Sequence, residues 1–84
     1  GKEIALYNGY GELLSTMVQG KVDNMSANIQ TYLKKNYKAY KPVDIYSVKK
    51  IAEKQNLYKV IVAHKKTKAQ EELWFNTSGK IVTF

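Results

Sequence analysis

The 84-residue chain contains no cysteine and no arginine, and it has one histidine and one proline. Without cysteine, neither disulfide bonds nor thiolate–metal bonds can stabilise the fold, which excludes the disulfide-stapled secreted scaffolds. All fourteen basic residues are lysines, and the net charge is +7. Lysine lacks the planar fork with which arginine reads guanine and phosphate, so the composition argues against sequence-specific nucleic-acid recognition. No run approaches the roughly 20 apolar residues of a membrane-spanning helix.

A short phrase near the start of the chain recurs at its end, 68 positions later. Both copies read aromatic-Asn-x-x-Gly, then one variable residue, two aliphatic residues and a hydroxyl residue. Asn8 and Asn76 suit the first position of a type I turn, and Gly11 and Gly79 suit the fourth, where φ is positive. Each phrase therefore predicts a β-hairpin with a bulge.

The other periodicities predict one helix and several strands within a single domain spanning residues 1–84. Apolar residues recur at helical spacing between Met25 and Leu33, Asn24 or Ser26 can cap the start, and Pro42 bars continuation. The expected elements are a hairpin within 1–18 (strands 2–8 and 12–18), a helix over 24–37, and antiparallel strands within 43–84 (43–51, 57–64, 70–76 and 80–84). The order ββ-α-ββββ predicts an α+β fold, with one α-helix packed on an antiparallel sheet of five to six strands.

The residues that carry chemistry do not form a catalytic pattern. His64 has no Ser, Cys or carboxylate at motif spacing, and zinc needs three or four ligands. Glu71 and Glu72 are adjacent on a predicted strand, so they point to opposite faces, and charge pairing with lysines of the 65–68 loop is the expected role. The Asn/Gly turns lead into strands and not into a helix, unlike a Walker loop. The sequence therefore predicts a protein that is not an enzyme and has no cofactor or metal.

The aromatic residues indicate binding. In the last hairpin, the bulge places Trp74 and Val82 on one face of the sheet, whereas Phe75 and Ile81 occupy the other. One helix covers only one face, so the second apolar face must curl over its own hairpin, pair with a second copy, dock a partner, or stay half-buried without a partner. The binding hypothesis is that this face meets a protein or peptide partner or a second copy. The spacing leaves open which face the helix takes. The candidate partner-binding residues are Tyr46, Tyr58, Trp74, Val82 and Phe84.

These segments also resemble a known family. The helix phrase Ile-Gln-Thr-Tyr-Leu-Lys-Lys-Asn-Tyr at 29–37, the strands at 43–51 and 57–62, and the phrase Leu-Trp-Phe-Asn-Thr-Ser-Gly-Lys at 73–80 resemble the PepSY-like family, small secreted or periplasmic domains common in Bacteroidetes. The resemblance covers residues 22–84, and residues 4–16 look like the closing hairpin of a preceding unit.

The PepSY-like resemblance implies a β-lactamase-inhibitor-protein-like fold, no enzymatic activity, and binding or inhibition of a protein or peptidase. It also implies export, so we expect a periplasmic or extracellular location with the signal segment removed. This chain departs from full-length members because it begins at a hairpin without that hairpin's own helix. The family has no catalytic residues to carry across.

A different kind of binding is the alternative. Tyr37 and Tyr40 stand among Lys34, Lys35, Lys38 and Lys41, and aromatic rings mixed with positive charge suit a stacking platform for single-stranded nucleic acid. The same composition is typical of a helix C-terminus that packs onto a sheet. The alternative hypothesis is therefore an electrostatic binder of nucleic acid or anionic surfaces.

Overall fold

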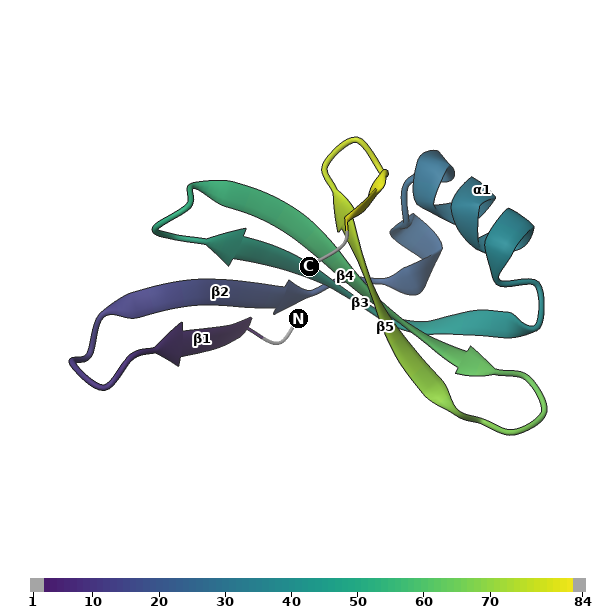
Figure 1. Cartoon of the computed structure of the whole chain (residues 1–84), viewed down its shortest axis with the longest axis horizontal. Coiled ribbons are helices and arrows are strands. Elements are labelled where there is room, and N and C mark those ends of the chain that lie inside the picture. The colour runs from purple at the N-terminus through teal and green to yellow at the C-terminus, as the bar shows by residue number, and fades with distance from the viewer. Residues whose placement is uncertain (1–2, 83–84) are drawn as a thin grey trace.

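A computed structural model describes residues 3–82 and shows one α-helix lying against a six-stranded antiparallel sheet (Figure 1). The strands follow one another across the sheet in chain order, which confirms the predicted α+β fold. The elements are β1 (Glu3–Tyr7), β2 (Leu13–Gln19), the short 3-10 helix η1 (Val22–Asn24), α1 (Ala27–Asn36), β3 (Tyr40–Lys50), β4 (Gln55–His64), β5 (Gln70–Asn76) and β6 (Ile81–Val82).

Both Asn/Gly turns have the predicted geometry. In the first, the Gly11 amide donates to the Asn8 carbonyl at 3.1 Å, and Gly11 has a φ of +81°. In the second, the Gly79 amide donates to the Asn76 carbonyl at 3.0 Å, and the φ of Gly79 is +83°. Each Asn side chain also accepts two backbone N–H bonds of 2.8–3.0 Å from its own turn. The repeated phrase is therefore one turn structure used twice.

The helix is shorter than its predicted span of 24–37. Ser26 is the N-cap, and its hydroxyl accepts the Ile29 amide at 3.3 Å. The preceding residues form the 3-10 turn η1, because the extended backbone of Met25 and Ser26 interrupts helical hydrogen bonding. At the other end, the backbone amide of Tyr37 donates a hydrogen bond of 2.8 Å to the Leu33 carbonyl and closes the helix.

Strand β3 begins three residues before its predicted start at 43 and contains Pro42. The pairing with β4 shifts between Pro42 and Asp44, which marks a bulge at Val43. A bulge is one of the few positions in a sheet that accepts proline, which has no N–H to donate. The prediction that the proline precedes the strand was therefore wrong, although the helix does end before it.

The hydrophobic core lies between α1 and one face of strands β3, β4 and β5. Ile29 and Leu33 of the helix pack against Val60 and Phe75 of the sheet, and Ile29, Val60 and Phe75 have no exposed surface. The Tyr32 ring meets the Phe75 ring edge to face, with centroids 5.4 Å apart. Since alternate residues of a strand share a face, the helix takes the face of Val60 and Phe75, which answers a question that the sequence left open.

The tip of the last hairpin rests on the start of the helix. The Asn28 side-chain amide donates to the Ser78 carbonyl at 2.9 Å. A Cβ built on Gly79 would stand 2.5 Å from the Cβ of Asn28 and 3.4 Å from the hydroxyl of Ser26. Glycine is therefore required at position 79 for two reasons, the positive φ of the backbone and the close approach of α1.

Within residues 3–82, no helix is long and apolar enough to cross a membrane.

Candidate functional site

Four side chains form a row across the sheet face opposite the helix. The register pairs Tyr46 of β3 with Lys59 of β4, Lys59 with Trp74 of β5, and Trp74 with Val82 of β6. Neighbouring Phe75 points into the helix-covered core, so Trp74 points away from it. We call Tyr46, Lys59, Trp74 and Val82 the cross-strand row. All four are half-buried, so part of each side chain faces solvent.

Lys59 connects the two aromatic rings of the cross-strand row. Its ammonium lies 5.7 Å from the Tyr46 ring centroid and 5.9 Å from that of Trp74, within the range of a cation–π contact. The same ammonium forms an ion pair of 3.0 Å with the Glu72 carboxylate. The lysine therefore holds both rings in place across three strands, and its charge is balanced by a neighbour on the same face.

Lys59 was missed in the sequence, although a signal was present. It is the one charged residue within the apolar run from Leu57 to Ala63. In a strand that is apolar on both faces, a single lysine indicates a position at which one face reaches solvent.

The structure brings three of the five candidate residues together. Tyr46, Trp74 and Val82 belong to the cross-strand row. Tyr58 lies on the opposite face, where it pairs with Phe75 across β4 and β5 and packs against the core. Its inclusion on the helix-free face was wrong, because Tyr58 is one residue out of phase with Lys59. Phe84 lies outside the described residues.

A groove of about 470 Å³ lies beside the helix on the other side of the molecule. Its lining comes from η1, α1, the start of β3 and the loop after β4, and includes Lys34, Lys38 and Lys65 together with Tyr37 and Tyr40. We call it the lysine groove. The Tyr37 and Tyr40 rings meet edge to face at 5.4 Å, so they pack on each other and do not form two parallel platforms.

Tyr37 stays protonated over a wider pH range than a free tyrosine. Burial raises the pKa of Tyr37 above its ordinary value of 10.0, and the carboxylate of Glu71 raises it further. A neutral phenol at the edge of the lysine groove is a hydrogen-bonding group and not a nucleophile at neutral pH.

Two of the three residues considered as catalytic candidates in the sequence, His64 and Glu72, have structural partners. The Nδ1 atom of His64 accepts the backbone amides of Lys66 and Thr67 at 3.1 and 3.2 Å, so the imidazole holds the β4–β5 turn. Glu72 does form a cross-strand ion pair, but its partner is Lys59 and not a lysine of the 65–68 loop. Among residues 3–82, no group of three or more potential metal ligands is found.

No protein-family model matches the chain, and no curated protein matches it either.

Proposed function

We propose that the protein is an exported, non-enzymatic binding module that recognises a protein or peptide through the cross-strand row. The observation that carries this proposal is the row itself. Tyrosine and tryptophan are the residue types that most often dominate binding energy at protein interfaces. Here Tyr46 and Trp74 are aligned on a sheet face that the helix leaves free, and each half-buried ring keeps part of its surface in solvent.

The arrangement favours binding because the rings are fixed before a partner arrives. Lys59 lies against both rings, and each ring sits on a strand that is hydrogen-bonded on both sides. Ordering the side chains in advance lowers the entropic cost of association. The PepSY-like resemblance adds three further proposals, namely export to the periplasm or the extracellular space, membership of that family, and a peptidase as one class of partner.

The experiment compares three forms of the protein. Wild type, Trp74→Ala and the control Tyr10→Ala are immobilised and exposed to secreted and periplasmic extracts, and retained proteins are identified. Tyr10 is 92% exposed in the first turn, away from the cross-strand row, so it controls for the loss of an exposed aromatic ring. We expect proteins retained by wild type and Tyr10→Ala to be lost from Trp74→Ala. Equal retention by all three forms contradicts the proposal.

The inhibitory part is tested separately. A panel of serine, cysteine and metallopeptidases is assayed with and without the protein at concentrations up to about 100 μM, which detects inhibition weaker than typical protease–inhibitor pairs. Inhibition by wild type that is absent from Trp74→Ala supports a peptidase partner. No inhibition across the panel removes the peptidase proposal and leaves the binding proposal to the retention experiment.

A second candidate function is electrostatic binding of nucleic acid or an anionic surface. The observation that favours it is the lysine groove, whose lining contains three lysines and two tyrosines against one carboxylate, that of Asp23. Phosphate binding by lysines weakens steeply with salt. A gel-shift assay with single-stranded DNA at low salt is expected to show retention that disappears at physiological salt. Absence of retention at low salt refutes this function.

A further inference from the structure

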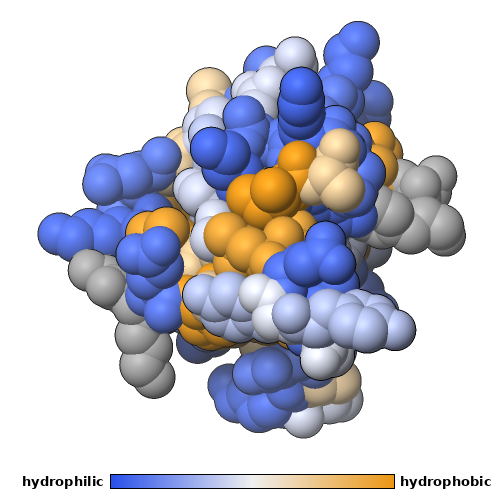
Figure 2. All heavy atoms as spheres, turned by 90° about the vertical axis from the view of Figure 1, so that its left-hand side faces the viewer, coloured by the Kyte–Doolittle hydropathy of each residue, from blue (hydrophilic) through white to orange (hydrophobic). Residues whose placement is uncertain are grey.

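The exposed apolar surface is concentrated on the hairpin formed by β1 and β2. Viewed from that end of the molecule, hydrophobic surface gathers among hydrophilic side chains (Figure 2). All large exposed hydrophobic residues among residues 3–82 except Ile81 belong to this hairpin, namely Ile4, Leu6, Tyr7, Tyr10, Leu13, Leu14 and Val18. Such a concentration on a small protein usually marks an interaction site.

Comparison with the C-terminal hairpin shows what the first hairpin lacks. The two hairpins share one turn structure, and Tyr7 pairs with Leu13 as Phe75 pairs with Ile81. Phe75 is fully buried, and its strand β5 is hydrogen-bonded on both sides, to β4 and β6. Tyr7 is 58% exposed, and within residues 3–82 its strand β1 is bonded only to β2. Strand β1 therefore lies at an open edge of the sheet, although most of its side chains are apolar like those of a strand inside a sheet.

The direction in which the backbone N–H and C=O groups of β1 point can be worked out from the hydrogen bonds of the hairpin. The Asn8 amide donates to the Glu12 carbonyl, so the polar groups of Asn8 point toward β2. The extra residue of the β1–β2 bulge is on β2, so alternation along β1 is unbroken. Since the direction of these groups alternates in an antiparallel pair, those of Glu3, Ala5 and Tyr7 point outward. All five residues of β1 are exposed.

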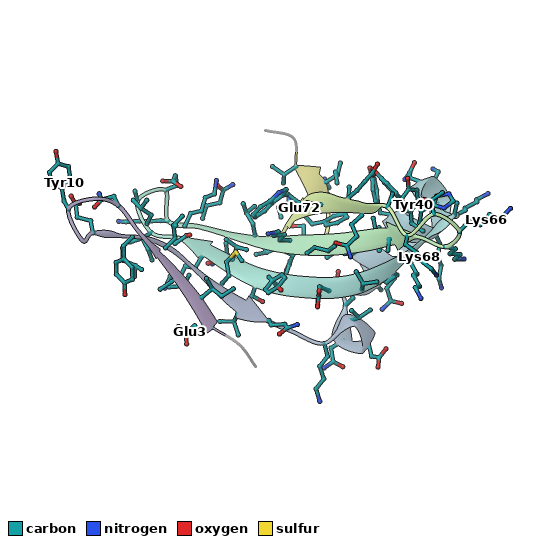
Figure 3. All side chains as sticks on the ribbon, turned by 90° about the horizontal axis from the view of Figure 1, so that it is seen from below. Glu3, Tyr10, Tyr40, Lys66, Lys68 and Glu72 are labelled. Carbon is teal, nitrogen blue, oxygen red and sulfur yellow. The ribbon has the colours of Figure 1, made fainter. Side chains whose placement is uncertain are left out.

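Charge separates this edge from the rest of the molecule. None of the fourteen lysines falls within residues 3–20, whereas thirteen fall within residues 21–82. Lysine is the residue that most often protects an open edge against pairing, and β1 lacks it. Tyr10 lies at one end of the molecule, Lys66 and Lys68 lie at the other, and Glu3 lies between them on the side of Tyr10 (Figure 3). Two chains of charge +7 meet with least repulsion at this end.

We propose that β1 pairs antiparallel with β1 of a second copy, which joins two sheets into one of twelve strands. The outward groups allow a two-fold register in which Ala5 lies opposite Ala5 of the partner subunit. Glu3 then lies opposite Tyr7 of the partner subunit, and Ile4 lies opposite Leu6 of the partner subunit. The two Glu3 carboxylates stand about four residues apart along the strands, roughly 13 Å, beyond the screening length at physiological salt.

The interface is expected to be small. Two five-residue strands and their flanking side chains bury less than the roughly 1,200–2,000 Å² of a standard stable interface. The dimer is therefore concentration-dependent, with monomer dominant at low micromolar concentration and dimer detectable in the hundreds of micromolar. This contact is distinct from the cross-strand row, so its failure and that of the proposed function are separate results.

Sedimentation equilibrium from about 10 μM to 1 mM tests the association. Leu6→Lys places a charge in the paired register, where Leu6 is 56% exposed and a lysine can be accommodated. Tyr10→Lys adds the same charge to the same hairpin outside the register. We expect wild type and Tyr10→Lys to dimerise alike, and Leu6→Lys to remain monomeric with an unchanged circular dichroism spectrum. A wild type that is monomeric throughout, or a Leu6→Lys variant that dimerises like wild type, overturns the proposal.

A cysteine placed at the two-fold axis tests the register. The chain has no cysteine, so Ala5→Cys supplies the only thiol. Hydrogen-bonded partners in an antiparallel pair have Cα atoms about 5.5 Å apart, within the range of a disulfide. Mild oxidation should therefore give a covalent dimer of Ala5→Cys, and none of Tyr10→Cys, whose two thiols are on the order of 30 Å apart. Equal cross-linking of the two variants contradicts the register.

Discussion

Replacing either turn glycine with alanine separates two reasons for needing glycine. Gly11 and Gly79 have almost the same φ, +81° and +83°. A Cβ on Gly11 would meet nothing within 4 Å, whereas a Cβ on Gly79 would stand 2.5 Å from the Cβ of Asn28. The two substitutions therefore share the cost of a positive φ and differ in the clash with α1.

The magnitudes follow from this difference. Holding alanine at positive φ costs roughly 1–2 kcal/mol, which is the whole expected loss in unfolding free energy for Gly11→Ala. Overpacking adds roughly 1–3 kcal/mol, so Gly79→Ala is expected to lose about 2–5 kcal/mol. Urea unfolding followed by circular dichroism and by the fluorescence of Trp74, the only tryptophan, measures both.

A second substitution at the contact checks the cause. Asn28→Gly removes the Cβ that the alanine at position 79 meets, so the double variant should recover about 1 kcal/mol or more of the loss after the cost of Asn28→Gly alone is subtracted. If Gly11→Ala and Gly79→Ala lose the same free energy within about 0.5 kcal/mol, the hairpin tip does not rest on the helix and the reasoning is refuted.

Three further predictions concern the core, the helix cap and the partly buried Tyr37. Phe75→Ala should lower the unfolding free energy by about 3–5 kcal/mol and its neighbour Trp74→Ala by about 1 kcal/mol, because only Phe75 points into the core; equal losses in urea unfolding contradict the assignment of faces. Ser26→Ala should cost about 1 kcal/mol through the lost bond to the Ile29 amide, and unchanged thermal unfolding would show that the cap is dispensable. Because burial and Glu71 raise the pKa of Tyr37 above 10.0, the folded state favours the neutral phenol, so this contribution to stability is fully present below pH 10 and is lost as the pH rises through the folded pKa. Urea unfolding at a series of pH values should therefore show the unfolding free energy of wild type falling relative to that of Tyr37→Phe only above about pH 10. If the difference between the two free energies stays constant up to about pH 11, the prediction is wrong.

Local signals were enough to predict most of the fold. The Asn/Gly turns fix both hairpins because their side-chain and φ requirements are met within a few residues, and the pairing of Trp74 with Val82 follows by counting from the turn. The start of β3 was misplaced because Pro42 normally excludes a strand, and only the pairing of the whole sheet reveals the bulge that accepts it.

The candidate site was less predictable because it depends on which face the helix covers. The strand around Val60 is apolar on both faces, so its composition does not distinguish them. Once α1 is placed on the Phe75 side, Tyr58 moves to the covered face, and Lys59 joins Tyr46 and Trp74 on the free face. Tertiary packing, and not propensity, makes that choice.

The affinity of a retained partner for wild type, Trp74→Ala and Tyr10→Ala, measured by isothermal titration calorimetry, tests the central claim most directly. If the cross-strand row is the binding surface, removal of the Trp74 ring costs about 2 kcal/mol of binding free energy, or roughly a 30-fold rise in Kd, while Tyr10→Ala binds like wild type. A folded Trp74→Ala variant that binds the partner with unchanged Kd contradicts the claim.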